Sequence, residues 1–282
     1  MARNVILGYI ERDTLIHRLS GLTKLIGFLL WSIAAMISFD TRMLALLVAI
    51  SLWLFGMSKI KFKEIAHVFY FILFLMIINA IFIFLFSPEE GVKIYGARTV
   101  LYKFNDAYTI TAEQLFYQMT VVLKYFAIVP IALLFILTTQ PNEFAASLNA
   151  IFVPYTIAYS VAIALRYIPD VQRDYRNISN AQQARGIDMS KNANAFVRLK
   201  NIASIILPLV LASIDRINSI SNAMELRGFG KKHRRTWYSA RPFDRRDAIA
   251  TAACALLILF VLFVTWTNGS RFYNPFKAVL LQ

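Results

Sequence analysis

Long apolar runs separated by short polar segments dominate the hydrophobic pattern of this chain. We predict a membrane-spanning helix for each of five runs, which cover residues 25–39, 43–57, 68–86, 116–137 and 248–265. The first two are shorter than the ~20 residues that a spanning helix usually needs. The polar Asp40-Thr41-Arg42 between them favours a tight helical hairpin over one long helix. The pattern therefore predicts an all-α integral membrane protein with about five transmembrane helices.

The segment between the third and fourth runs, residues 88–114, is polar and contains Gly91 and Gly96. We expect it to form a loop outside the cell. Its β-branched residues and glycines predict a short β-hairpin between residues 92–95 and 100–104.

A basic region with a different pattern follows the fourth run. Residues 166–246 contain 16 Lys and Arg against 6 Asp and Glu. Residues 155–167 before it are apolar but short, and residues 142–168 could dip into the bilayer. Further along, apolar residues recur at helical spacing, which predicts amphipathic helices that rest on the membrane domain or on each other. These apolar positions are Ile178, Ala181 and Ala184 in one helix, and Ile214, Ile217, Ile220, Ala223 and Leu226 in the other.

Nine residues of this basic region occur nearly twice. Residues 178–186 read Ile-Ser-Asn-Ala-Gln-Gln-Ala-Arg-Gly, and residues 220–228 read Ile-Ser-Asn-Ala-Met-Glu-Leu-Arg-Gly. Six of the nine positions are identical, at an offset of 227 − 185 = 42 residues. Each copy ends in Arg-Gly, and glycine just past the last turn is the usual helix cap because it accepts a positive φ. We therefore predict that each copy ends a helix at its arginine.

A single arginine at a helix C-terminus has an ordinary explanation, because it complements the helix dipole for ~0.3–1 kcal/mol. That effect does not require the preceding Ile-Ser-Asn-Ala to recur. Two copies instead favour two docking ends, since the planar guanidinium can engage a partner's carboxylate through two hydrogen bonds. The small Ala181 and Ala223 would let a partner surface close around each end.

Composition and charge support the membrane assignment and give it an orientation. The chain has 282 residues, of which 58% are hydrophobic and 16% charged, with a mean hydropathy of +0.56 and a net charge of +14. Basic residues concentrate in cytoplasmic loops of membrane proteins, so the N-terminus, the 58–66 loop and residues 140–246 are predicted to be inside. We accordingly divide the chain into residues 1–139 with four spans, 140–246 as a cytoplasmic domain, and 247–282 with the last span and an external tail. Lys231, Lys232, Arg234 and Arg235 are best explained by contact with anionic lipid rather than nucleic acid.

Other functional classes find little support in the residues. The chain lacks a phosphate-binding loop, a His-Glu-x-x-His and a Gly-x-Ser-x-Gly,. The lone Cys254 is expected to be an inert packing residue, and no metal site is predicted. Two alternatives remain, a membrane-embedded transferase and a stand-alone secondary transporter. The second would usually carry ionisable residues inside its spans, and only Lys124 qualifies here.

The paired Ala-Gln-Gln-Ala-Arg-Gly and Ala-Met-Glu-Leu-Arg-Gly segments resemble the motifs of a known family. It is the transmembrane T component of energy-coupling factor (ECF) transporters, relatives of the cobalt-transporter Q protein. The resemblance extends to residues 15–19, 22–25, 139–143 and 165–169, although Ser20-Gly21 stand where the family commonly has Asp-Pro.

This resemblance implies a non-catalytic coupling subunit of a bacterial ABC importer, embedded as a multi-pass protein in the plasma membrane. Its partners would be the lipid bilayer, two ABC-type ATPase subunits that bind ATP and Mg, and an S component that captures a vitamin or metal ion. The resemblance implies that one arginine binds each ATPase subunit. It also implies that the apolar faces near residues 155–165 and 202–212 contact the S component. The residues implied in ATPase coupling are Ala184, Arg185, Gly186, Leu226, Arg227 and Gly228, supported by Asn180, Ala181, Asn222 and Ala223.

Overall fold

The computed structural model describes residues 9–103, 109–187, 195–231, 236–238, 240–268 and 270–276, with the backbone only for residues 195–200. The chain forms two compact units. The first unit comprises Met1–Gln140 and Pro242–Gln282, and the second comprises Pro141–Arg241.

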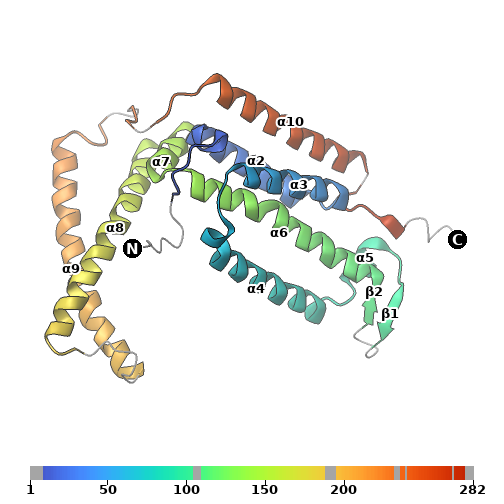
Figure 1. Ribbon diagram of the computed structural model, residues 1–282, viewed down its shortest axis with the longest axis horizontal. Helices are drawn as coiled ribbons and strands as arrows, with labels where there is room; N and C mark the ends of the chain where they lie inside the picture. Colours follow the sequence, from blue (N-terminus) through green and yellow to red (C-terminus); the bar gives the residue numbers. More distant parts are fainter. Residues whose placement is uncertain are drawn as a thin grey trace. The chain divides into compact units, whose positions relative to one another are not determined.

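All five predicted apolar runs form helices in the first unit. They are α2 (Gly21–Ile37), α3 (Thr41–Met57), α4 (Phe62–Phe86), α6 (Ala112–Thr138) and α10 (Arg245–Thr267), and a short α1 (Leu15–Arg18) precedes them. Three of the five, α4, α6 and α10, are long and apolar enough to cross a membrane, whereas α2 and α3 have 17 residues each. Figure 1 shows α2 and α3 lying along α6, with α10 beside α2 and α4 along the opposite side of α6.

The tight hairpin predicted between α2 and α3 is confirmed, and Asp40 explains its geometry. The Asp40 side chain caps α3 by accepting a 2.9 Å hydrogen bond from the Arg42 backbone amide. It is almost fully buried and also accepts a 2.6 Å hydrogen bond from the Asn268 side-chain amide beyond α10. A single buried carboxylate therefore fixes both the start of α3 and the end of α10.

The core of the first unit lies where α2, α3, α6 and α10 meet. The buried residues that form it are Trp31, Ala35, Leu44, Leu47, Ala127, Ile131 and Val261. Small residues such as Ala35 and Ala127 let helix backbones approach closely, which is how helices associate in lipid. The Trp31 indole donates a 2.9 Å hydrogen bond to the Ala127 carbonyl, one turn before Pro130. This bond ties α2 to α6 one residue after Phe126, whose carbonyl loses its helical partner because Pro130 has no amide hydrogen,.

The predicted β-hairpin is only half right. Residues 92–95 belong to a helix, α5 (Glu90–Tyr95), and the hairpin instead pairs β1 (Val100–Lys103) with β2 (Thr109–Thr111). Residue 104 lies outside the described residues. The reason is a close approach at Gly91, where an added Cβ would lie 2.4 Å from the Glu113 carbonyl oxygen. Gly91 therefore seats the start of α5 against α6, and β-branched residues after it follow the helix.

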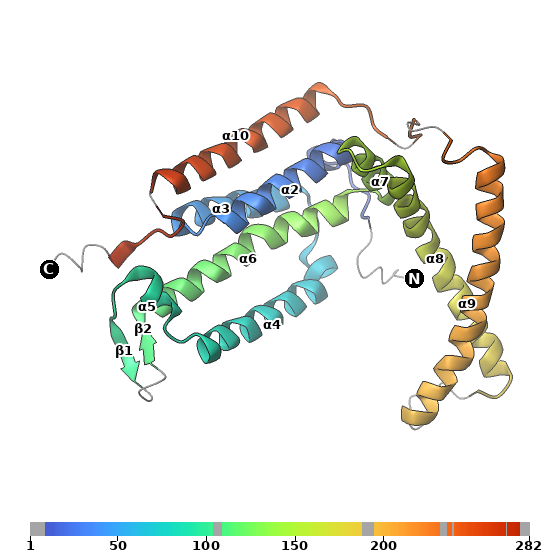
Figure 2. The same cartoon turned by 180° about the vertical axis from the view of Figure 1, so that it is seen from behind.

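The second unit contains α7 (Pro141–Ala150), α8 (Tyr155–Ala184) and α9 (Ala195–Leu226). The short apolar stretch at residues 155–167 is not a separate helix. It is the first part of α8, which is 30 residues long and continues through Pro169. Residues 201–226 of α9 also meet the length and hydropathy criterion for a membrane span. The positive charge of residues 166–246 instead predicts the cytoplasmic side for this segment,. Figures 1 and 2 show α8 and α9 crossing each other.

Candidate functional site

The first copy of the repeat forms the C-terminal end of α8. Arg185 follows the last helical residue, and Gly186 adopts a left-handed conformation with φ of 88°. The Gly186 amide donates to the Gln183 carbonyl at 3.0 Å, and the Ile187 amide donates to the Gln182 carbonyl at 3.1 Å. This pair of hydrogen bonds is a Schellman motif, in which glycine at the left-handed position satisfies the last free carbonyls of a helix.

The second copy ends α9 with the same geometry. Gly228 is left-handed with φ of 67°, and its amide donates to the Glu225 carbonyl at 2.8 Å. The Phe229 amide donates to the Met224 carbonyl at 2.9 Å. Arg185 and Arg227 thus occupy the same capping position, which confirms the prediction of two glycine-capped helix ends. We call residues 184–186 the first arginine end and residues 226–228 the second arginine end.

Both arginine ends project from the surface of the second unit. Arg185 and Arg227 are exposed, as are Ala184 and Gly186, while Leu226 is 90% exposed and Gly228 is half-buried. Among the described residues, the Arg185 guanidinium has no hydrogen-bonding or ionic partner. The supporting residues Asn180, Ala181, Asn222 and Ala223 are also exposed. Each end therefore presents a permanent positive charge at the surface, next to Ala184 in the first copy and Leu226 in the second.

The two helices carry their ends away from a common crossing. Near the middle of each helix, the Arg216 guanidinium forms a 2.6 Å ion pair with the Asp174 carboxylate. On one side of this point, the Gln182 side chain of α8 donates to the Ser204 carbonyl of α9 at 3.3 Å. On the other side, Tyr159 of α8 meets Phe229 just after α9, with ring centroids 5.0 Å apart. Because later α8 residues meet earlier α9 residues, the helices run in roughly opposite directions.

The apolar positions predicted for these helices are mostly exposed. Ala181, Ala184, Ile214, Ile217 and Leu226 are all exposed, and Ile178 and Ile220 are half-buried. The polar contacts between α8 and α9 are the Asp174–Arg216 ion pair and the Gln182–Ser204 hydrogen bond. Residues of α9 at helical spacing consequently form an exposed row, which we call the α9 apolar stripe: Leu207, Val210, Leu211, Ile214 and Ile217.

An aromatic cluster distinguishes the second arginine end from the first. Phe229, directly after Gly228, packs on Tyr155 and Tyr159 at centroid distances of 5.7 and 5.0 Å. Trp237 completes the cluster 5.6 Å from Tyr155, and its indole donates a 3.1 Å hydrogen bond to the Asn149 side chain. The second arginine end is therefore attached to the start of α8 and to α7. Lys232, Arg234 and Arg235, predicted to contact lipid, lie outside the described residues.

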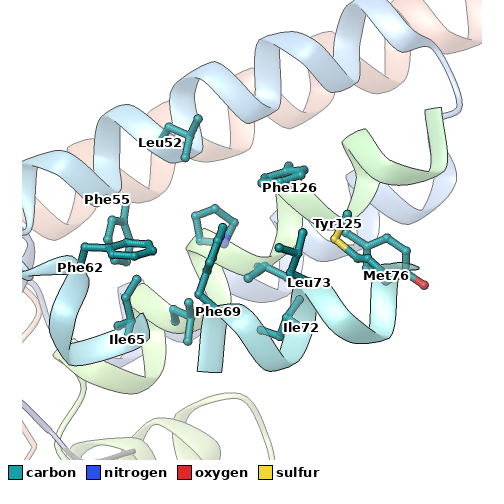
Figure 3. Close-up of a pocket in the computed structure, with 13 residues that line it drawn as sticks. Leu52, Phe55, Phe62, Ile65, Phe69, Ile72, Leu73, Met76, Tyr125 and Phe126 are labelled. Carbon is teal, nitrogen blue, oxygen red and sulfur yellow. The ribbon is translucent and has the colours of Figure 1, made fainter. Parts of the chain in front are cut away.

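Outside the arginine ends, the described residues of the first unit line two cavities. No group of three or more His, Cys, Asp or Glu among them could hold a metal ion. A cavity of about 130 Å³ between α3, α4 and α6 is lined by apolar and aromatic side chains (Figure 3). A larger one of about 320 Å³, between α2, α3, α6 and α10, includes Lys24. Its ammonium donates to the Thr138 carbonyl at 2.7 Å, where it completes the end of α6.

Lys124, the one ionisable residue predicted inside a span, forms a contact between two helices of the first unit. Its ammonium donates a 2.8 Å hydrogen bond to the Met36 carbonyl in the last turn of α2 and lies over the Phe39 ring. The last carbonyls of a helix have no partner in the helix and carry its negative dipole end. Lys124 therefore joins α6 to the end of α2, as a packing contact of the bundle.

Sequence reasoning missed the ion pair at the helix crossing. Asp174 and Arg216 lie outside the nine repeated residues. They carry opposite charges, so a search for identical residues does not pair them. A signal was present, because 216 − 174 = 42 equals the offset of the repeat. Extending the alignment upstream of Ile178 and Ile220 would have paired these two positions.

Comparison with known proteins places the chain among membrane transport components. A family model described as cobalt transport protein matches residues 12–238. A protein of Leuconostoc gelidum subsp. gasicomitatum, named energy-coupling factor transporter transmembrane protein, is 26% identical over 280 residues, which cover 94% of this chain and 99% of the relative. A protein of the same name from Streptococcus thermophilus is 28% identical over 273 residues, with coverage of 94% and 99%.

Proposed function

The chain belongs to the cobalt transport protein family, and we propose that it is the coupling component of an ECF transporter. As a transmembrane component of such a transporter, it is a membrane subunit. In the proposed role, it links ATP hydrolysis by two cytoplasmic ABC-type ATPase subunits to uptake of a vitamin or metal ion through an S component. ATP and Mg bind to the ATPases, and this chain carries out no chemistry itself.

The observation that carries this proposal is the pair of matched arginine ends. Each places an exposed guanidinium at the same capping position of a long helix. One such end can bind a carboxylate in a groove of one ATPase subunit, and the second end binds the other subunit. Burying a guanidinium against a carboxylate gives a contact whose truncation typically costs about 2–5 kcal/mol. A helix attached at such an end transmits a displacement of the ATPase to the rest of the second unit.

The α9 apolar stripe supports a second contact, with the S component. It lies on the same helix as the second arginine end, and its five aliphatic side chains are exposed. The stripe overlaps residues 202–212, which the resemblance assigned to the S component. A membrane protein that packs on this stripe would sense every movement of α9. We propose that displacement of α8 and α9 by the ATPases reorients the S component and releases its substrate into the cell.

This role requires both arginine ends on the cytoplasmic side of the bacterial plasma membrane. The positive charge of residues 166–246 supports that side,. On this orientation the N-terminus is cytoplasmic, and α9 lies at the membrane surface although its length and hydropathy would allow a span.

Charge reversal at both arginine ends tests the proposal. We expect Arg185→Glu with Arg227→Glu to abolish co-purification of the two ATPase subunits in mild detergent while the chain still inserts into the membrane. A matched control is Arg173→Glu with Arg176→Glu, which makes the same charge change at two exposed arginines of α8. ATPases that co-purify normally with the first double variant would contradict the proposal, and so would transport by the purified chain alone.

A further inference from the structure

The ion pair between Asp174 and Arg216 occupies a special place in the second unit. The two residues are separated by the repeat offset of 42, so each is the counterpart of the other in the two copies. Where two related helices cross, contact between counterpart residues marks a local two-fold axis. The contacts on either side agree, since the end of α8 meets the first half of α9 and the end of α9 meets the start of α8.

The axis places the two arginines at the same distance from the crossing. Arg185 follows Asp174 by 11 residues, and Arg227 follows Arg216 by 11 residues. At 1.5 Å per residue, each arginine lies about 16 Å along its helix from the crossing. The angle between the helices at the crossing therefore sets the distance between the two arginines.

The Asp174–Arg216 ion pair is more buried than an ordinary surface ion pair. The Asp174 and Arg216 side chains are 30% and 36% exposed, and the Arg216 guanidinium also lies 5.8 Å from the centroid of the Tyr167 ring. A second ion pair of α8, between Asp170 and Arg173, is one turn away and joins residues of the same helix at 3.0 Å. That pair is more exposed and joins two residues of α8, so it provides a control within one helix.

We propose that Asp174 and Arg216 are positioning residues that fix the crossing of α8 and α9 and thereby the spacing of the two arginine ends. This inference rests on the proposed coupling function, because the spacing matters only if both ends dock. It assigns to the pair the role of keeping the ends matched to two sites on the ATPases, so that displacement of one end is transmitted to the other.

The spacing can be measured without any partner. Spin labels on Gln183→Cys and Glu225→Cys, which are counterparts near the two ends, report the distance in the full chain after Cys254→Ala removes the sole native cysteine. We expect one narrow distance distribution. Asp174→Arg should broaden or shift it because two guanidiniums would meet at the crossing, and Asp174→Arg with Arg216→Asp should restore it. Exchange of the control pair, Asp170→Arg with Arg173→Asp, should leave it unchanged.

A broad distribution in the parent chain, or an unchanged one in Asp174→Arg, would overturn the proposal. Should Asp174→Arg fail to fold, Asp174→Asn can replace it, because it removes the charge at nearly constant shape. Asp174→Asn should also broaden the distance distribution, by less than Asp174→Arg.

The complete transporter gives a second readout. With ATPases bound, we expect Asp174→Asn to lower the amount of substrate moved per ATP hydrolysed by about 2- to 30-fold, and the exchanged pair to recover it. A normal ratio in Asp174→Asn would overturn the positioning role. Failure of the docking proposal looks different, since ATPases would then bind Arg185→Glu with Arg227→Glu normally.

Discussion

Arginine next to a left-handed glycine lies at the limit of its helix, where the backbone ladder has ended. The Schellman motif satisfies the last carbonyls of each helix, so capping them does not require the arginine side chain,. At both arginine ends the glycine determines where the helix stops, and the arginine determines what the end can bind. The two neighbouring residue types therefore have separable roles.

We predict that alanine at the first glycine weakens the helix end and keeps its charge. Gly186→Ala meets no atom within 4 Å, so its cost is the left-handed conformation alone, about 1 kcal/mol,. Hydrogen exchange at the amides of residues 186 and 187 should accelerate about fivefold. Gly56→Ala in α3 also meets open space but in helical conformation, and it should be neutral or stabilising,. Equal exchange in Gly186→Ala and the parent chain would contradict the prediction.

The two arginines should not contribute equally. Phe229 holds the second arginine end against Tyr155 and Tyr159, whereas the described residues show no aromatic cluster at the first. The residues before each arginine also differ, with Gln183-Ala184 in one copy and Glu225-Leu226 in the other. We expect Arg185→Glu and Arg227→Glu to reduce transport to different extents, measured as initial uptake rates in vesicles. Indistinguishable losses would argue against distinct sites on the two ATPases.

At the scale of helices, the apolar runs predicted the elements well because helices in lipid must be both long and apolar. The positions of α2, α3, α4, α6 and α10 follow from those runs, and the turn at Asp40 follows from its charge. Packing decided the cases that pattern reasoning missed. Gly91 admits the close contact that makes residues 90–95 a helix, and α8 continues through Pro169.

The candidate site divides in the same way. The repeat identified both arginine ends and their glycine caps, because backbone capping is a local property of sequence. The crossing at Asp174 and Arg216 depends on how two helices meet. Because the two residues carry opposite charges, an alignment of the two copies shows no identity at this position. The exposure of Ile214 and Ile217 could not be predicted either, because periodicity identifies an apolar face without identifying what covers it.

The α9 apolar stripe should be needed for the S component and not for the ATPases. We expect Leu211→Gln with Ile217→Gln to reduce the amount of small membrane protein that co-purifies, while both ATPase subunits remain bound. The reason is the loss of two exposed aliphatic side chains, each worth about 1.5–3 kcal/mol when fully buried,. Asn218→Gln, at an exposed polar position on the same helix, is the control. Loss of the ATPases with an unchanged S component would contradict this assignment.

At the scale of the whole molecule, the function depends on which side of the membrane each end of α9 occupies. If α9 crossed the bilayer, the ends of α8 and α9 would face opposite sides. We predict that Gln183→Cys and Glu225→Cys, each in a Cys254→Ala background, are both protected from a membrane-impermeant maleimide in intact cells. Tyr102→Cys, on the exposed face of β1 in the predicted external loop, should react. Reaction of one helix end and protection of the other would show that α9 spans the membrane.

The ion pair on the local two-fold axis has a consequence for how such a helix pair can be built. In a symmetric homodimer, a residue on the axis faces its own copy, so an aspartate would meet an aspartate and an arginine an arginine. Either arrangement would repel. Because both helices belong to one chain, the two copies can differ at this position and place opposite charges there. A covalent pair can thus use an attraction at its centre that is forbidden to two identical subunits.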